Sequence, residues 1–173
     1  MTSKIIHTLS DDEIKLLKHE IEYNKNLWRL HNYPAGARRY TLGESIFIYD
    51  VFSHFTPYID NKYLFPQTVD FLVKKLNSTA LMRTYWHKLM PGDYVYTHVD
   101  TGTYFDKVDR YQIYFDVPFD CVIVIDEKLW NINENTNLSN KIVYFDKSLF
   151  HTYFNLSNSP VIILICDILK TEN

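Results

Sequence analysis

The sequence predicts an α+β chain, mainly β, in which a double-sheet roll or barrel carries helices from the N-terminal part of the chain. Three observations favour this class: amphipathic helical segments occur within residues 1–78, apolar residues alternate with a period of two from residue 79 onward, and turn-forming residues separate the alternating runs. The 173 residues contain no repeat and no linker-like segment. We therefore expect a single domain over 1–173, with a helical N-terminal support at 1–78 and a β-roll at 79–173.

The helical part of the chain is expected in two segments. The first begins at Ser10, a good N-cap, and Glu13 follows three residues later at the spacing of a capping box. The second spans 65–77 and has Pro66 in its first turn, where a helix tolerates proline because that N–H has no partner anyway. Each segment carries an apolar stripe at helical spacing and should pack that stripe on the sheet. A strand is expected between them, at 45–51.

The roll is expected from short runs that are rich in β-branched and aromatic residues and bounded by turn-forming residues. The Asn-rich segment 131–140 is expected to be one exposed loop. The expected strands lie within 79–90, 93–100, 110–118, 121–126, 141–146, 151–155 and 160–169.

Composition and charge argue against several classes of function. The formal net charge is −3 with both signs interspersed, which argues against a nucleic-acid groove on a basic face. No apolar run approaches the about 20 residues of a membrane span, and the N-terminus lacks the apolar region of a secretory signal. Cys121 and Cys166 lie in apolar runs and are expected to be reduced core residues. We therefore expect a cytoplasmic protein without nucleic-acid or membrane partners.

Metal-ligand residues occur near the end of the second expected strand of the roll. His98 and Asp100 are two apart, so in a regular strand they face the same way, together with Tyr94 and Tyr96. This pair alone is weak evidence for a metal site, because a chance histidine beside a turn-capping aspartate gives the same pattern. His151, at the start of a later strand, adds a second imidazole. Two imidazoles and one carboxylate form the facial triad of non-heme Fe(II) oxygenases, which leaves metal positions open for a cosubstrate and O2.

The stretch from Leu81 to Ile168 resembles the aspartyl/asparaginyl β-hydroxylase family, a branch of the Fe(II)/2-oxoglutarate-dependent dioxygenases. KLMPGDYVYTHVDTG is similar to the family's strand, Pro-Gly turn and strand with the first metal histidine. RYQIYFDVP is similar to the next strand, which opens with a basic residue, and KIVYFDKSLFHTYFNLSNSPVIILICDI to the closing strands with the second metal histidine. The resemblance implies a double-stranded β-helix, which is a jelly-roll or cupin-like fold.

The resemblance also implies an activity and a metal site. The activity would be that of an Fe(II)/2-oxoglutarate-dependent dioxygenase that hydroxylates an amino acid side chain of the Asp, Asn or Pro type, free or in a peptide. His98, Asp100 and His151 would bind the iron and form the catalytic centre. Some well-known members lack the carboxylate ligand, whereas this chain has Asp100 and fits the full triad of the wider superfamily.

The cosubstrate site departs from the family pattern. Family members usually carry an arginine about ten residues after the second metal histidine, where it holds the distal carboxylate of 2-oxoglutarate; here that place falls at Pro160 or Val161. An anion in a water-poor pocket needs a charge-assisted partner. We expect Arg110, His87 and Gln112 to bind the cosubstrate instead.

Substrate contacts and two other functions remain open. Arg38 and Arg39, in the loop PAGARRYTLG, precede the roll, where segments of this superfamily often cover the pocket; with Tyr96 they are candidate substrate contacts, and an arginine pair would favour an acidic group. A solvated surface loop fits the same residues. The missing arginine favours a jelly-roll metalloenzyme that does not use 2-oxoglutarate, and a non-catalytic β-roll that binds a ligand is the third reading. The oligomeric state is not indicated.

Overall fold

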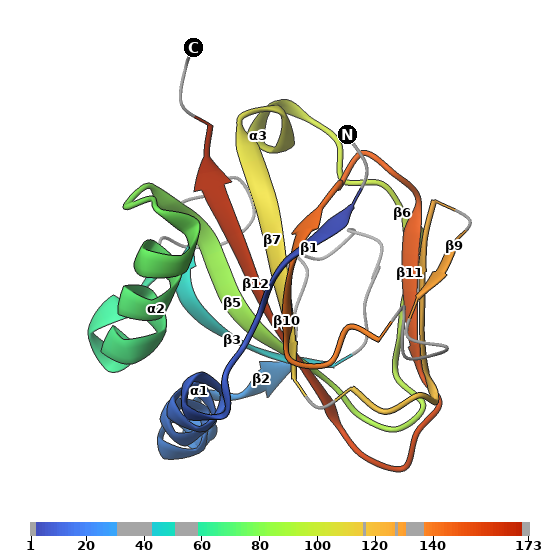
Figure 1. Cartoon of the computed structure of the whole chain (residues 1–173), viewed down its shortest axis with the longest axis horizontal. Coiled ribbons are helices and arrows are strands. Elements are labelled where there is room, and N and C mark those ends of the chain that lie inside the picture. The colour runs from blue at the N-terminus through green and yellow to red at the C-terminus, as the bar shows by residue number, and fades with distance from the viewer. Residues whose placement is uncertain are drawn as a thin grey trace.

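The computed structural model describes residues 3–30, 43–50, 59–115, 117–126, 128–130 and 137–170. In these residues the chain forms three layers: two helices, a larger sheet and a smaller sheet, with the larger sheet in the middle (Figure 1). This arrangement of two facing sheets with helices on one outer face confirms the predicted jelly-roll class with helices packed on it.

The two longer helices form where the sequence predicts them. Helix α1 (Asp11–Tyr23) begins with the expected capping box, in which the backbone N–H of Ser10 donates to Glu13 Oε2 over 2.8 Å and the Glu13 N–H donates to Ser10 Oγ over 3.3 Å. Helix α2 (Pro66–Leu76) has no side-chain cap of its own. The buried carboxylate of Glu20 in α1 accepts hydrogen bonds from the first turn of α2 and caps it from outside. A short helix α3 (Thr103–Asp106) and short 3-10 helices at Lys25–Leu27 and Lys62–Leu64 complete the set in the described residues.

All strand pairs of both sheets are antiparallel. The larger sheet has the order β1-β10-β7-β12-β5-β3-β2, with β4 paired to β3, and the smaller sheet has the order β6-β11-β8-β9. The larger sheet comprises β1 (Lys4–Thr8), β2 (Arg29–Leu30), β3 (Glu44–Asp50), β4 (Ile59–Asp60), β5 (Leu81–Leu89), β7 (Val108–Phe115), β10 (Lys141–Phe145) and β12 (Val161–Leu169). The smaller sheet comprises β6 (Tyr94–His98), β8 (Cys121–Ile125), β9 (Lys128–Trp130) and β11 (His151–Asn155).

The sheet is not confined to residues 79–173. Strands β1 and β3 come from the N-terminal part of the chain and pair with β10 and β5, respectively. The N-terminal part therefore supplies strands to the roll as well as the helices that support it. The strand at 45–51 was predicted, whereas β1 and the partners of both strands could not be read from the sequence, because strand partners far apart in the chain are chosen by long-range packing.

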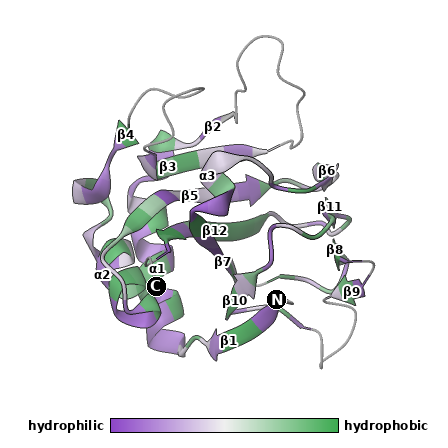
Figure 2. Ribbon diagram, turned by 90° about the horizontal axis from the view of Figure 1, so that it is seen from above, coloured by the Kyte–Doolittle hydropathy of each residue, from purple (hydrophilic) through white to green (hydrophobic). Residues whose placement is uncertain are grey.

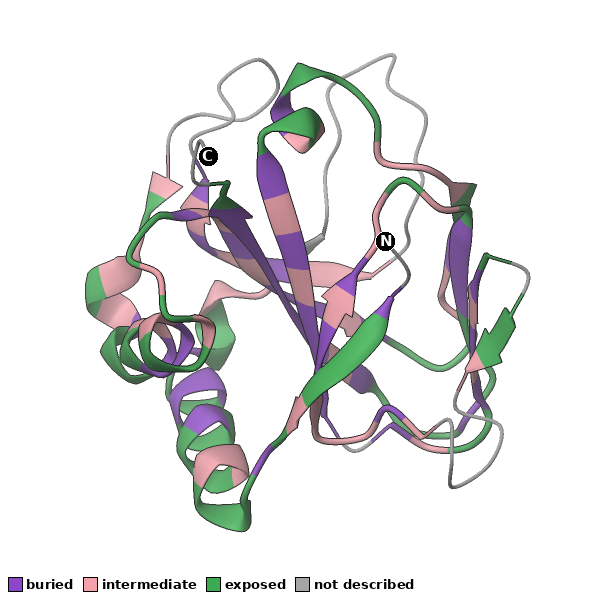
Figure 3. Cartoon of the chain, turned by 45° about the horizontal axis from the view of Figure 1, so that its top comes forward, coloured by how far each residue is buried: buried purple, intermediate pink, exposed green. Residues whose placement is uncertain are grey.

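The larger sheet separates two hydrophobic cores. The helix-side core packs Leu17 and Leu72 of the helices against Trp86 and Leu164 of the sheet, whereas the inter-sheet core packs Ile163 and residues around it against the smaller sheet. Figure 2 shows the hydrophobic colouring along β12, and Figure 3 shows buried residues along the larger sheet and exposed ones on the outward sides of the helices.

Two smaller predictions concern cysteines and membranes. Cys121 and Cys166 are buried and free, one in each core, as expected for core residues. Within the described part of the chain, every helix is too short or too polar to cross a membrane.

Candidate metal centre

Three potential metal ligands converge at one end of the space between the sheets. His98 ends β6, His151 begins β11, and these two residues pair across the strands, while Asp100 follows two residues after His98. The ligand atoms of the three side chains all lie within 4.8 Å of one another. Asp100 Oδ1 lies 3.6 Å from His98 Nε2, and Asp100 Oδ2 lies 3.9 Å from His151 Nε2. Among the described residues, this is the one group of three such side chains close enough to hold a metal ion.

Backbone carbonyls orient both imidazole rings. Nδ1 of His98 lies 2.7 Å from the carbonyl oxygen of Tyr96, and Nδ1 of His151 lies 2.9 Å from that of Leu149. A carbonyl oxygen only accepts, so each Nδ1 carries the proton and each Nε2 presents its lone pair toward Asp100. This is how metal-binding histidines are usually held. The donor set therefore fits a divalent metal such as iron.

Burial keeps His151 neutral. Burial and, to a smaller extent, the neighbouring His98 lower the pKa of the His151 imidazole, the Asp100 carboxylate opposes them, and the net result is a pKa of about 4. At neutral pH the ring is therefore uncharged, as a metal ligand must be.

A β-bulge changes the face on which Tyr96 lies. The pairing of β6 with β11 shifts between His98, opposite His151, and Val95, opposite Tyr153. Val95 is buried, whereas Tyr96 is half-exposed and its hydroxyl lies 2.6 Å from that of Tyr94. The predicted alternation, with Tyr94 and Tyr96 on the face of His98, is therefore wrong, because the extra residue of the bulge reverses the faces. A substrate contact by Tyr96 stays a prediction, and it would be made from the outer face of the smaller sheet.

Arg110 is buried in a network of carboxylates. Its Nε donates to Asp167 Oδ1 over 2.7 Å and its Nη2 to Asp167 Oδ2 over 2.9 Å, while Nη1 donates to Oδ2 of Asp100. The Tyr104 hydroxyl donates to Asp167 Oδ2 over 2.9 Å. Burial disfavours the guanidinium charge, but Asp100 and Asp167 outweigh this effect and raise the pKa of Arg110. The sequence assigned no role to Asp167 or Tyr104; an aspartate at the end of an apolar strand was the available signal.

Uncharged polar groups continue along the inner face of the larger sheet. Gln112 Oε1 accepts hydrogen bonds from the Tyr114 hydroxyl and, over 2.8 Å, from the Tyr153 hydroxyl. In the adjacent strands, Ile163 pairs with Tyr114 on one side and with His87 on the other.

His87 and Val161 mark the end of the inner face away from the triad. Nδ1 of the buried His87 lies 3.0 Å from Ser45 Oγ. Val161, one of the two residues at which the resemblance places the family's arginine, is completely buried and belongs to the inter-sheet core. At this position the structure therefore has a buried apolar side chain.

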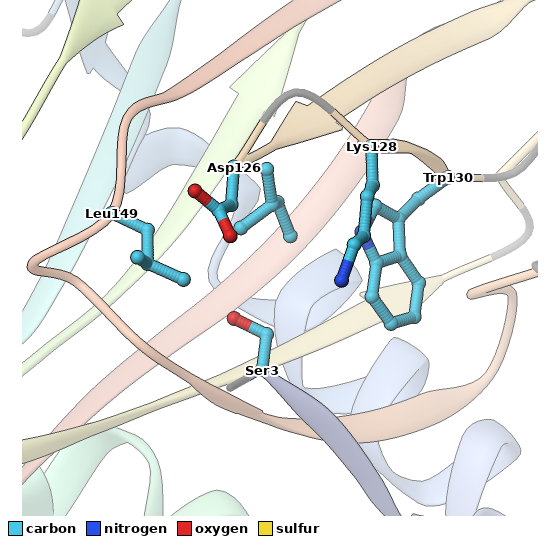
Figure 4. A pocket seen from close by; sticks show the side chains of 6 residues that line it. Ser3, Asp126, Lys128, Trp130 and Leu149 are labelled. Carbon is cyan, nitrogen blue, oxygen red and sulfur yellow. The ribbon is translucent and has the colours of Figure 1, made fainter. Parts of the chain in front are cut away.

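Arg38 and Arg39, the other predicted substrate contacts, lie outside the described residues. A small hollow lies beside β11, since Leu149, whose carbonyl orients His151, is part of its wall (Figure 4). Its charged groups are one carboxylate, on Asp126, and one ammonium, on Lys128, and no imidazole lines it. The hollow is therefore separate from the triad. It is lined by Ser3, Ile125, Asp126, Lys128, Trp130 and Leu149.

Comparisons with known proteins agree with the fold. A search among curated proteins finds no match. A prolyl hydroxylase from Trichoplax adhaerens, solved with a peptide fragment of the hypoxia inducible factor oxygen degradation domain, superimposes with a TM-score of 0.63 at 10% identity, covering 96% of this chain and 83% of that chain. The viral collagen prolyl hydroxylase of Paramecium Bursaria Chlorella virus-1, solved with 2-oxoglutarate, gives 0.61 at 15% identity, covering 99% and 97%. HygX from Streptomyces hygroscopicus, with nickel and 2-oxoglutarate bound, gives 0.59 at 14% identity, covering 98% and 82%.

The sequence itself identifies the family. Residues 36–171 match the family described as aspartyl/asparaginyl beta-hydroxylase. The match begins well before Leu81, where the resemblance was predicted to start, and it includes all three triad residues and Arg110. The chain therefore belongs to the aspartyl/asparaginyl β-hydroxylase family.

Proposed function

We propose that this hydroxylase-family protein is an Fe(II)/2-oxoglutarate-dependent dioxygenase that hydroxylates an amino acid side chain, with His98, Asp100 and His151 as the iron ligands. The convergence of these three side chains within 4.8 Å carries the proposal. When bound, iron with 2-oxoglutarate and O2 supplies an oxidant that places one oxygen atom in a substrate C–H bond, with succinate and CO2 as products.

The protein would orient the reactants and exclude water. His98 and His151 keep their Nε2 lone pairs available through the hydrogen bonds to backbone carbonyls. The buried walls around His151 limit the water near the site, which favours reaction with the substrate over side reactions.

For the cosubstrate, we propose contacts with His87 and Gln112, whereas Arg110, which the sequence also predicted to bind it, donates to Asp167 and Asp100. His87 and Tyr114 flank Ile163 on the inner face, next to the place where the family's arginine is replaced by Val161. The distal carboxylate of 2-oxoglutarate, if bound here, would receive hydrogen bonds from the His87 imidazole and the Tyr114 hydroxyl in place of a guanidinium. His87 would therefore be the basic group of this end of the site.

The proposed substrate is an Asp, Asn or Pro side chain, free or in a peptide. The family description supports Asp and Asn as the substrate residues, and the peptide complex of the Trichoplax prolyl hydroxylase supports a peptide as the substrate. Arg38, Arg39 and Tyr96 remain proposed substrate contacts.

Metal binding and succinate release test this function. Wild-type protein should bind one equivalent of Mn(II) under anaerobic conditions and, with Fe(II), should release succinate from 2-oxoglutarate. His151→Ala should lose both properties because two ligands hold the metal poorly. His19→Ala, an exposed histidine of α1, is the matched control and should keep both.

A second function is favoured by one observation. Val161 and its buried apolar neighbours provide no cation for a distal carboxylate at the family position. A metalloenzyme of this fold that does not use 2-oxoglutarate would bind Mn(II) but release no succinate with any amino acid or peptide offered. Absence of metal binding by the wild type would contradict both functions and would favour a non-catalytic binding protein.

A further inference from the structure

We infer that Arg110, held in place by Asp167, is a positioning residue that fixes the carboxylate of Asp100 for metal binding. This inference rests on the proposed function, because it assigns a role relative to the proposed metal ligand. It differs from the role predicted from the sequence, in which Arg110 holds a carboxylate of the cosubstrate.

The guanidinium of Arg110 is fixed from two sides. Asp167, on the paired position of β12, takes two parallel N–H donors, and both side chains are buried. A bidentate pair of this kind fixes the plane of the guanidinium. The third donor, on Nη1, points to Oδ2 of Asp100. The ring of Phe105 lies 5.1 Å from the guanidinium carbon and covers it. Three of the five N–H groups of Arg110 are thus used by carboxylates.

The two oxygens of Asp100 have different surroundings. Oδ2 accepts from Arg110, whereas Oδ1 lies 3.6 Å from Nε2 of His98. Because Arg110 occupies Oδ2, the carboxylate cannot rotate without losing a charge-assisted hydrogen bond. Oδ1 is therefore directed toward His98 as the oxygen for the metal, while Oδ2, which Arg110 holds, lies 3.9 Å from Nε2 of His151. A metal-binding carboxylate held in this manner by a neighbouring donor is preorganised.

Asp167 gives the network a suitable charge. A guanidinium beside a metal site would repel a divalent cation if its charge were uncompensated. The completely buried carboxylate of Asp167 neutralises Arg110, so that Arg110 can orient Asp100 without adding net positive charge beside the metal. The charge left for the metal is that of Asp100.

The segment that carries Asp100 is tied to the same pair. The backbone N–H of Asp100 donates to the Lys147 carbonyl over 3.0 Å. Four residues later, the Tyr104 hydroxyl donates to Asp167 and accepts the backbone N–H of Arg83 over 3.1 Å. Both the side chain of Asp100 and the short helix that follows it are therefore anchored by the Arg110–Asp167 pair.

Mn(II) binding without cosubstrate tests the inference directly. We expect Arg110→Lys, which keeps the charge but loses the planar fork, and Asp167→Asn, which leaves Arg110 without its counter-charge, to bind Mn(II) about 10–100-fold more weakly. Tyr104→Phe, which keeps all charges, should give a smaller loss and serves as the variant least disturbing to folding. Once saturated with Mn(II), each variant should bind 2-oxoglutarate within about 2-fold of the wild type. Electron paramagnetic resonance measures free Mn(II), and circular dichroism checks the fold.

Asp109→Asn is the matched control. Asp109 precedes Arg110 in β7, points to the other face and contacts the Tyr144 hydroxyl, so its change should leave Mn(II) affinity unaltered. Unchanged Mn(II) affinity in Arg110→Lys together with weaker 2-oxoglutarate binding would overturn the inference and return Arg110 to the cosubstrate. Wild-type protein that binds Mn(II) while all three variants match it would overturn the inference alone. Failure of the wild type to bind Mn(II) would overturn the proposed function as well.

Discussion

The two cores of the protein, on opposite faces of the larger sheet, bury different kinds of side chain. The helix-side core is built from aliphatic and aromatic residues of α1, α2 and the sheet. The inter-sheet core has a similar apolar base but also encloses Arg110, Gln112, His87, His151 and Asp167. Burying a polar group is costly unless it is hydrogen-bonded, and each of these five side chains has a hydrogen-bond partner in the network described above. One face of the sheet therefore supplies stability, and the other holds the site.

The largest effect is expected in the helix-side core. Leu72→Ala would leave a cavity at a completely buried position of α2, and the free energy of unfolding should fall by about 2–5 kcal/mol. Urea unfolding measures this change. Leu16→Ala, at an exposed position of α1, is the control and should change stability by no more than about 0.5 kcal/mol. Weaker Mn(II) binding by folded Leu72→Ala protein would contradict the assignment of stability to one core and of the site to the other.

A smaller effect is expected from one hydroxyl of the inter-sheet core. Tyr114→Phe removes a donor to Gln112, which retains the hydrogen bond from Tyr153, so stability should fall by about 1 kcal/mol. Tyr111→Phe, next to Ile113 of the same strand but facing the helix side, is the matched control. In our proposal Tyr114→Phe also weakens 2-oxoglutarate binding, measured by titration of Mn(II)-loaded protein, whereas Tyr111→Phe does not. Equal effects of both changes on binding would mean that the two faces do not differ as described.

The smallest effect concerns pH and the start of α1. Burial raises the pKa of Glu13, but the hydrogen bond and charge of Lys75 and the hydrogen bonds from Ser10 outweigh it and lower the pKa to about 2. As the pH falls, the Glu13 carboxylate is protonated in the unfolded chain before it is protonated in the folded protein. The stabilisation from the Glu13 carboxylate is therefore complete above about pH 4.5 and is lost as the pH falls toward 2. Glu13→Gln should therefore cost about 0.5 kcal/mol near neutral pH and little at low pH.

Urea unfolding of wild type and Glu13→Gln across this pH range measures the difference. Since Glu13 lies at the edge of the helix layer, Mn(II) affinity near neutral pH should be the same in both proteins. A constant difference in stability at all pH values would contradict the assignment to the Glu13 carboxylate.

Local features of the fold could be predicted from the sequence. The capping box of Ser10 and Glu13 and the strands expected after residue 79 depend on neighbours in the chain, and both appear as expected, apart from the alternation in β6. The pairing of β1 with β10 and the bulge in β6 could not be predicted. Pairing depends on distant partners, and a bulge of one residue leaves no mark in an alternating run.

In the candidate site, too, features set by local sequence could be predicted, and features set by long-range pairing could not. The His–x–Asp spacing and a later histidine predicted the triad, and the structure brings the three side chains together. The pairing of Arg110 with Asp167 depends on the register between β7 and β12, so a list of residues gave Arg110 but not its partner. The place of Val161 could be predicted only as a departure from the family, because the sequence does not show which side chain takes over from a missing arginine.

The hydrogen bonds from the imidazole rings to the main chain have a consequence for how this protein can change. Any amino acid at positions 96 and 149 offers the same backbone carbonyl oxygen, so the orientation of the imidazole rings of His98 and His151 does not depend on the side chains at these two positions. Substitutions of the outward-facing residue at position 96 can therefore change the surface next to the site while the orientation of the two histidines stays the same.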